Sequence, residues 1–485
     1  MRSRISRHLT QVLSRPPDGD AVLDEALRPA AEPQVPPPPP ELSGRDYAIF
    51  LLRLGAEVEH GLMVQYLFAA YSLGGRHEPA RPDVRAWQEA ILGIAKEEMG
   101  HLVTVQNLLT ALSAPLNFNR EEFPHDTVLY PFGFRLQPVS LGSLATYICA
   151  ESPADWDDAE AREIKALAEV DAGSPVNRVG TLYAELLRVL GDPTLVADAD
   201  FSAASVAFQA SWDEWGRGYR EGQRGVEAMS GLPQLPAPEL LIREVGSRAA
   251  ALDAIEQVGE QGEGFESPAD DATSHFRRFL AIYRGLKALG DGAAGVVRPL
   301  ATNPTTDLEG PDVGGPDDPA TTTPIVHEQA RLWAHLFNLR YRKLLVNLSH
   351  AFELSDDPGD RTTLSPRGAL IHRTFSEMYN LRAIAGQLVA LPVDGAQPDG
   401  PRAGPPFQIP HTLMLPPDEG GRWRLHRDVL DASATMIARL RDDGSAGGRA
   451  YLAALAQMDA IERGQLEQLI AGSARLPAAS GAPVP

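Results

Sequence analysis

The clearest hydrophobic pattern in the chain runs through residues 88–112, where apolar side chains recur at intervals of three and four residues. This spacing predicts a long helix with one buried stripe. Glu98 and His101 lie on that stripe, one helical turn apart. A carboxylate and an imidazole on the buried side of a helix need partners, because an unpaired buried charge is very costly. A metal ion would be one such partner.

A second pattern of this kind runs through residues 45–73 and predicts the preceding helix. Its stripe includes Glu59 and, seven residues later, Tyr66, whereas Glu57 and His60 are expected to point away from it. The following loop contains glycine and proline, so the two helices should be antiparallel neighbours. Glu59 is therefore expected to face the helix predicted at residues 88–112.

The rest of the chain is also predicted to be helical, because no series of alternating apolar and polar residues indicates strands. The predicted fold class is all-α: a four-helix bundle with long insertions and a second, C-terminal helical region. The domains expected from composition are a disordered Pro-rich tail at 1–43, the bundle at 44–290, a linker rich in Gly, Pro, Asp and Thr at 291–324, a helical domain at 325–472 and a disordered tail at 473–485.

Composition narrows the classes of partner. The chain has 44 basic and 65 acidic residues, a formal charge of −21, which argues against nucleic acid and anionic membranes as partners. No apolar run reaches the roughly 18–20 residues of a membrane span. The single cysteine, Cys149, excludes an intrachain disulfide and fits a reducing compartment. We therefore expect a soluble, cytoplasmic protein.

The Glu-x-x-His spacing of the central helix has a precedent in di-metal bundles. There, two helices each supply one Glu and two others each supply a Glu-x-x-His pair, all directed inward. Here Glu59 would be the first Glu, and Glu98 with His101 the first pair. The alternative is a buried, hydrogen-bonded pair that only fixes the packing. A core-facing Glu on the preceding helix favours the metal.

Several longer motifs then identify a family. The runs EVEHGLMVQYLFAAYSL, AKEEMGHLVTVQNLLTAL, TVLYPFGF, EQGEGF, SHFRRFLAIYRGL and AGPPF occur in this order. Together they resemble ferritin-like proteins related to iminophenylpyruvate dimer synthase of violacein biosynthesis, over residues 44–410. The resemblance implies a ferritin-like bundle with a redox role in secondary metabolism. Relatives in the violacein and indolocarbazole pathways oxidatively couple imines of aromatic amino acids, but the specific substrate does not transfer.

The resemblance also implies a ligand set. It comprises Glu59, Glu98 and His101 in the first two helices, with Glu263 and His275 in the last segment. An insertion separates the last two residues, so the fourth helix would be interrupted and its halves would converge on the metal. Alternatively, Glu263 is a solvated loop residue and His275 a helix-terminal residue bonded to backbone.

The third helix departs from the family pattern, because Thr181 stands where relatives carry an acid. Glu185, four residues later, is the predicted replacement ligand, and Glu151 is a second candidate. If neither reaches the site, it would hold one metal or none. Tyr66 and Tyr183 are predicted to act in catalysis, by hydrogen-bonding a ligand or donating an electron; the alternative is that they are packed residues with satisfied hydroxyls.

These features predict a non-haem di-iron-type oxidoreductase acting on a small, amino-acid-derived substrate with O₂ or peroxide. Two iron ions are expected, with manganese or haem as alternatives. No Rossmann-type glycine motif follows a strand, so reducing equivalents would come from an external donor. A homo-oligomer is compatible with the sequence. The competing hypothesis is a non-catalytic helical scaffold or binding protein. In that case, Thr181 in place of an acid would be a sign that the metal site has been lost.

Overall fold

The regular structure of the chain is almost entirely helical. The only strands in the described residues are two short parallel ones, β1 (Pro304–Thr305) and β2 (Thr323–Pro324). This confirms the predicted all-α class. None of the described helices is long and apolar enough to cross a membrane. The computed structural model describes residues 40–74, 81–127, 129–215, 240–262, 274–309, 321–355, 365–409, 411–442 and 448–473.

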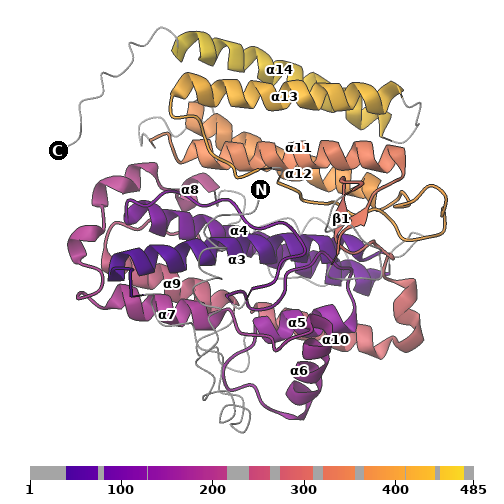
Figure 1. The fold of residues 1–485 in the computed structure, drawn as a ribbon, viewed down its shortest axis with the longest axis horizontal. Coiled ribbons are helices and arrows are strands. Elements are labelled where there is room, and N and C mark those ends of the chain that lie inside the picture. The colour runs from indigo at the N-terminus through magenta and orange to yellow at the C-terminus, as the bar shows by residue number, and fades with distance from the viewer. Residues whose placement is uncertain are drawn as a thin grey trace.

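Two long helices form the centre of the molecule (Figure 1). They are α3 (Gly44–Ser72) and α4 (Pro82–Ala111), which pack against each other along their length. Helix α3 begins at Ser43, whose hydroxyl accepts a hydrogen bond from the Asp46 amide at 3.1 Å. Helix α4 begins with a proline, which lacks the amide proton that the first turn leaves unpaired.

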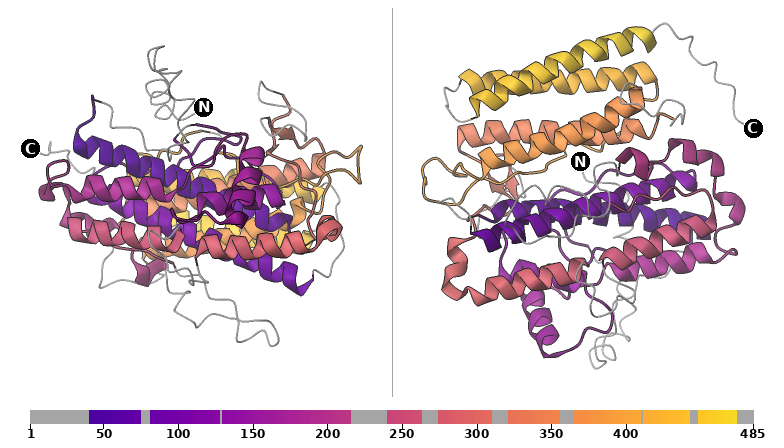
Figure 2. Two further views of the ribbon diagram at one scale, coloured as in Figure 1. Left: turned by 90° about the horizontal axis from the view of Figure 1, so that it is seen from below. Right: turned by 180° about the vertical axis from the view of Figure 1, so that it is seen from behind.

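Helix α3 is buried on nearly every side, because helices cover it from two directions (Figure 2). Glu57 and His60, which were expected to lie off the stripe of Glu59, are buried as well. Glu57 accepts hydrogen bonds from Asn117 (3.3 Å) and Tyr130 (3.1 Å). His60 shares a hydrogen bond with Tyr341, a residue of the C-terminal region. The apolar stripe marked only one of the two faces that this helix buries.

The third helix of the bundle is built from two separate pieces, α5 (Leu141–Ala150) and α7 (Gly180–Gly191). The second piece starts where the first ends, because the Val179 amide donates to the Ala150 carbonyl at 3.1 Å. The intervening residues leave the bundle and form α6 (Ala159–Ala172), which packs on α5.

The fourth helix is also interrupted, as the sequence predicted. Its pieces are α9 (Arg248–Gly262), which packs on α7, and α10 (His275–Ala288), which packs on α5. Both interruptions therefore occur at the middle of the bundle. The smaller helices of this region are η1 (Asp198–Asp200), η2 (Ala203–Phe208), α8 (Trp212–Trp215) and η3 (Gly290–Gly295).

A second group of four helices lies on the other side of α3 and α4 (Figures 1 and 2). It consists of α11 (Glu328–Ala351), α12 (Pro366–Leu388), α13 (Glu419–Asp442) and α14 (Arg449–Ser473). We call it the C-terminal bundle. Helix α11 packs on α12 and α13, and α13 packs on α14.

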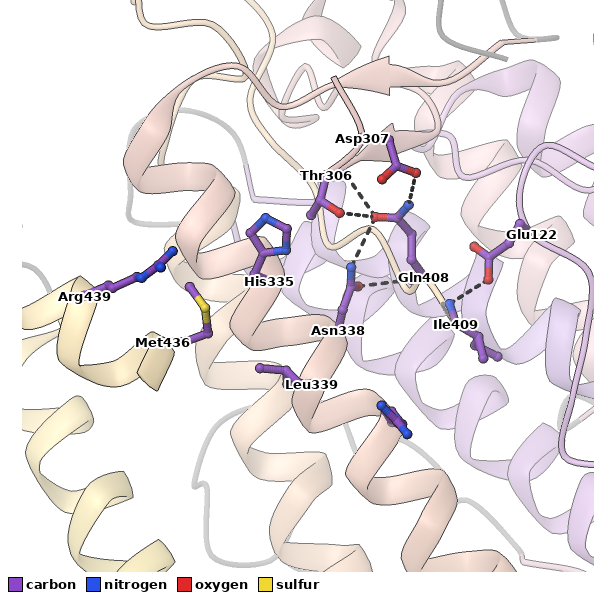
Figure 3. Close-up of a pocket in the computed structure, with 11 residues that line it drawn as sticks. Glu122, Thr306, Asp307, His335, Asn338, Leu339, Gln408, Ile409, Met436 and Arg439 are labelled. Carbon is purple, nitrogen blue, oxygen red and sulfur yellow. Dashed lines mark hydrogen bonds between the residues drawn. The ribbon is translucent and has the colours of Figure 1, made fainter. Parts of the chain in front are cut away.

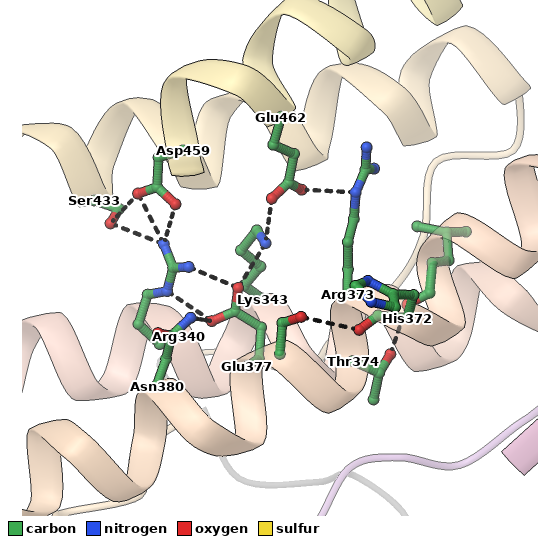
Figure 4. Close-up of polar contacts among 12 residues, drawn as sticks. Arg340, Lys343, His372, Arg373, Thr374, Glu377, Asn380, Ser433, Asp459 and Glu462 are labelled. Carbon is green, nitrogen blue, oxygen red and sulfur yellow. Dashed lines mark hydrogen bonds and ion pairs between the residues drawn. The ribbon is translucent and has the colours of Figure 1, made fainter. Parts of the chain in front are cut away.

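The core of the C-terminal bundle contains a network of ion pairs (Figure 4). Arg340 pairs with Glu377 at 2.6 Å and with Asp459 at 2.8 Å. Lys343 pairs with Glu377 at 2.7 Å and with Glu462 at 2.8 Å. Each buried acid of this network thus has a basic side chain of the same chain as its partner.

Candidate metal centre

Three buried side chains from α3 and α4 meet in the middle of the first bundle. One oxygen each of Glu59 and Glu98 and a ring nitrogen of His101 lie within 4.8 Å of one another. Nδ1 of His101 is 2.9 Å from Oε2 of Glu98 and 3.4 Å from Oε2 of Glu59. The helical stripes identified in the sequence thus bring these residues together.

A second group of the same composition shares one of these residues. Glu98, Glu151 and His275 also place one ligand atom each within 4.8 Å of one another. Nδ1 of His275 is 3.0 Å from Oε1 of Glu98 and 3.5 Å from Oε2 of Glu151. Glu98 therefore turns one carboxylate oxygen toward each histidine. The rings of His101 and His275 are stacked, with their centroids 5.7 Å apart.

The two helix interruptions supply the second group. Glu151 is the C-cap residue of α5, at the point where the third helix is broken. His275 is the first residue of α10, where the fourth helix resumes, and Ser274 caps that end by accepting a hydrogen bond from the Arg277 amide. A carboxylate and an imidazole thus reach the bundle axis from helix ends, where the helix period does not fix the direction of a side chain.

Three atoms that face this space form no hydrogen bond of regular geometry, although each lies within 3.4 Å of an oppositely charged group of the cluster. They are Oε2 of Glu59, Oε1 of Glu98 and Nδ1 of His275, and all three are buried. Such atoms are rare in folded proteins and call for an explanation. Carboxylate oxygens and imidazole nitrogens are the ligands of iron and manganese in bundles of this type. The residues of the cluster therefore fit a metal site.

The ionisation of these groups shows that the cluster attracts positive charge. Burial raises the pKa of Glu59 to about 8, and repulsion from Glu98 adds to this. Burial would lower the pKa of His101, but Glu59 and Glu98 raise it to about 10. Burial would likewise raise the pKa of Glu98, but His275 and His101 lower it overall. Protonated histidines thus provide the charge that metal ions would otherwise bring.

Further side chains orient the two histidines. Nε2 of His101 lies 3.0 Å from Oε1 of Gln261, and Nε2 of His275 lies 3.1 Å from Oε2 of Glu97. Arg278 in turn forms an ion pair with Glu97. Both imidazoles therefore direct Nδ1 toward the cluster. The partner of His101 is a neutral amide and that of His275 a carboxylate, so the two halves differ electronically.

These orienting residues were not found from the sequence. Glu97 directly precedes Glu98, and Arg278 follows His275 by three residues, so both lie beside predicted ligands. The sequence did contain a signal for them. The EEMGH motif has a second acid, Glu97, and a basic residue, Arg278, follows His275 by one helical turn. Both residues lie off the apolar stripes that predicted the ligands.

The two predicted catalytic tyrosines each contact a carboxylate of the cluster. The hydroxyl of Tyr183 donates to Oε1 of Glu59, and that of Tyr66 donates to Oε1 of Glu151 at 2.5 Å. In both cases the other oxygen, Oε2, remains directed at a histidine. The arrangement is thus repeated in the two halves of the site.

The predicted ligand Glu185 does not join this cluster. Glu185 pairs with Arg188 at 2.6 Å and accepts a hydrogen bond from Tyr47 at 3.3 Å, at the partly exposed side of α7. The structure therefore places Glu151, and not Glu185, in the cluster, because the break in the third helix lets an earlier acid reach the axis. Glu263 lies outside the described residues.

Comparison with known proteins agrees with this geometry. Residues 52–284 match the family described as Ferritin-like. The matched residues have the ferritin-like fold. They include every described residue of the cluster, from Glu59 to His275. The family thus accounts for the first bundle, whereas the C-terminal bundle lies beyond the matched residues.

Two curated relatives of this chain have the names of enzymes. The first is dichlorochromopyrrolate synthase of Lentzea aerocolonigenes, 28% identical over 406 residues, which are 76% of this chain and 36% of the relative. The second is 2-imino-3-(indol-3-yl)propanoate dimerase of Chromobacterium violaceum, 31% identical over 25% of this chain and 15% of the relative. The chain thus spans about a third of the length of the first relative and less of the second.

One solved structure is also similar. A ferritin-like protein from Caulobacter vibrioides shares 17% sequence identity with this chain, with a TM-score of 0.38. The similarity covers 71% of this chain and 96% of that protein.

Proposed function

We propose that this protein is a metal-dependent oxidoreductase that acts on a small, amino-acid-derived substrate in secondary metabolism. The observation that carries the proposal is the sharing of Glu98 between two groups, each completed by one further carboxylate and one histidine. A hydrogen-bonded pair that only fixes packing would need neither the second group nor a carboxylate placed between two histidines.

In this proposal the cluster holds two iron ions. Glu59 and His101 would hold one ion, Glu151 and His275 the other, and Glu98 would bridge them. Bound iron would supply one-electron redox chemistry toward O₂ or peroxide. Gln261 and Glu97 support the assignment, because each fixes the ring nitrogen that faces away from the metal.

The surrounding side chains orient the carboxylates and exclude water. Tyr183 and Tyr66 each hold one oxygen of a terminal carboxylate by donating a hydrogen bond to it. Beyond Tyr66 lie the rings of Tyr147 and Phe279, each with its centroid 4.9 Å from the Tyr66 ring. All three aromatic residues are buried, so charge that develops at the cluster is poorly screened by solvent.

The names of the relatives support the substrate class. One relative is named as dimerising 2-imino-3-(indol-3-yl)propanoate, which is a 2-imino acid, and the other is named as a synthase. We infer a related small imino or amino acid as the substrate, with O₂ or peroxide as oxidant and an external donor where electrons are required.

The proposal is tested with full-length protein reconstituted anaerobically with Fe(II). On exposure to O₂, we expect O₂ consumption that depends on an aromatic 2-imino acid generated in the assay, and we expect Glu98→Ala to abolish it. Glu57→Gln is the matched control, because Glu57 is a buried acid on α3 whose hydrogen bonds lie outside the cluster. Equal rates in wild type and Glu98→Ala would refute the proposal. A Soret band in the purified protein would identify haem instead.

A further inference from the structure

A pocket of about 630 Å³ lies away from the cluster, where the C-terminal bundle meets the loops of the first bundle (Figure 3). Its volume is within the range of small-molecule sites, roughly 300–1,000 Å³. One wall is a face of α11 that includes His335, Leu339 and Arg342. Met436 and Ile409 add apolar surface from α13 and from the loop that precedes it. None of the cluster residues lines this pocket.

The polar loop residues of the pocket satisfy one another. Oε1 of Gln408 accepts hydrogen bonds from the amide and hydroxyl of Thr306, both at 2.9 Å, and from the Asn338 amide at 3.2 Å. The side-chain amide of Gln408 donates to Asp307 at 3.3 Å. Glu122 accepts from the Ile409 amide at 2.6 Å. Both acids of this wall are therefore already engaged.

The backbone next to Gln408 is strained. Phe407 has a φ of 49°, in the left-handed region that a bulky side chain rarely adopts. Its ring is buried and packs against that of Phe337, with the centroids 4.7 Å apart. Strain of this kind persists where the surrounding structure enforces it, and it is concentrated at ligand-binding sites. The strained residue Phe407 directly precedes Gln408, which lines the pocket.

Arg342 is the exception among these polar groups. It forms no ion pair with any described residue, and its buried Nε atom has no hydrogen-bond partner. Burial alone lowers its pKa, with no acid to oppose the effect. Arg439 lines the same pocket, also without an ion pair among the described residues. His335 has a lowered pKa, first because of burial and then because of nearby Arg331 and Arg439. The pocket thus has two arginines and two acids in its lining, and neither arginine forms an ion pair with Glu122 or Asp307.

We propose that this pocket binds a small organic carboxylate, with Arg342 holding the carboxylate and Leu339, Ile409 and Met436 covering the apolar body. A guanidinium binds a carboxylate through two parallel hydrogen bonds. A bound carboxylate would therefore give the Arg342 side chain the hydrogen-bond partner that its Nε atom lacks among the described residues. The two acids of the pocket, Asp307 and Glu122, already accept hydrogen bonds from Gln408 and from the Ile409 amide. The site is separate from the metal cluster and does not depend on bound metal.

The probe for this site is phenylacetate, with phenylacetamide as its uncharged counterpart, titrated calorimetrically into the full-length protein. We expect one phenylacetate per chain and at least about tenfold weaker binding of the amide, because a charge-assisted bond is lost. Arg342→Gln should weaken phenylacetate binding by about tenfold or more and leave the amide unchanged. Arg342→Lys keeps the charge and should retain part of the affinity.

Arg85→Gln is the matched control, since Arg85 is an exposed arginine of α4 far from the pocket residues in sequence. The Arg85→Gln variant should bind phenylacetate with the affinity of the wild type. The inference is overturned if Arg342→Gln binds phenylacetate as tightly as wild type, which is also the result expected for binding at the metal cluster alone. Equal affinity for acid and amide, or no binding of either by wild type, overturns it as well.

Discussion

The two helical bundles of this protein bury acidic side chains in opposite ways. In the C-terminal bundle, Glu377 faces Arg340 and Lys343, so basic residues of the chain neutralise it (Figure 4). In the first bundle, Glu98 lies between two histidines. With their ordinary pKa of about 6.5, histidines are mostly neutral at pH 7. One core is electrostatically complete, and the other is completed by protons or by metal ions.

The difference teaches how a buried carboxylate can be assigned a role. An acid whose partners are arginine and lysine has its charge compensated permanently, because those groups remain charged at neutral pH. An acid whose partners are imidazoles can exchange protons for a metal. The same fold element, a bundle of long helices, thus serves structure in one half and, in our proposal, chemistry in the other.

The largest expected effect is on stability, from Glu377→Gln. This change leaves Arg340 and Lys343 short of one buried counter-charge and should reduce the free energy of unfolding by about 3–5 kcal/mol. Chemical denaturation measures it. By contrast, Glu59→Gln in metal-free protein removes a carboxylate whose ionised form burial disfavours, and should cost little or even stabilise. Equal destabilisation by the two variants would remove the distinction between the bundles.

A smaller effect is expected from the tyrosines that hold the terminal carboxylates. Tyr66→Phe removes the hydrogen bond to Glu151 and should weaken iron binding about 10–100-fold. Tyr147→Phe is the matched control, because the Tyr147 hydroxyl is buried without a hydrogen-bond partner in the described structure. Competition with a chelator measures both affinities. If the control loses as much iron as Tyr66→Phe, the phenolic bond has no role in holding metal.

The pH dependence should separate the bundles further. Burial would raise the pKa of Glu377, but Lys343 and Arg340 lower it overall from 4.5. Its contribution to stability is therefore complete above pH 4.5 and is lost as the pH falls through the lower value of the folded state. The net slope is moderated by Asp459, whose pKa burial raises. Unfolding curves below pH 4.5 should fall less steeply for Glu377→Gln than for wild type; identical slopes would contradict this account.

The smallest effect is expected at Glu185. Its ion pair with Arg188 is partly exposed, so Glu185→Gln should change the free energy of unfolding by about 0–1 kcal/mol. Iron content should be unchanged, as measured by elemental analysis. If Glu185→Gln lost as much iron as a Glu151→Gln variant, Glu185 would have to be a ligand after all.

Much of the fold and half of the cluster follow from helix periodicity. The apolar stripes of α3 and α4 place Glu59, Glu98 and His101 on facing sides of two helices, which the structure shows. The family motifs add His275. Periodicity fails for Glu151, because this residue caps a helix end and its direction depends on the break and on the Val179–Ala150 hydrogen bond.

The same limit explains the misplaced helix faces. A helix covered on two sides has no single buried stripe, so Glu57 and His60 lie off the stripe of Glu59 although both are buried. Their partners, among them Tyr341, are far away along the chain. His60 is buried because the C-terminal bundle lies against α3, and Glu57 because the loop after α4 covers it.

The central claim is that Glu98 bridges two metal sites, and an anaerobic Fe(II) titration of the metal-free protein tests it most directly. The account predicts about two equivalents of iron per chain in wild type and in Glu57→Gln, as in other bundles with this ligand pattern. It predicts that Glu98→Ala loses affinity at both sites together. Wild-type protein that binds one equivalent or less, or Glu98→Ala protein that binds iron as wild type does, would contradict it.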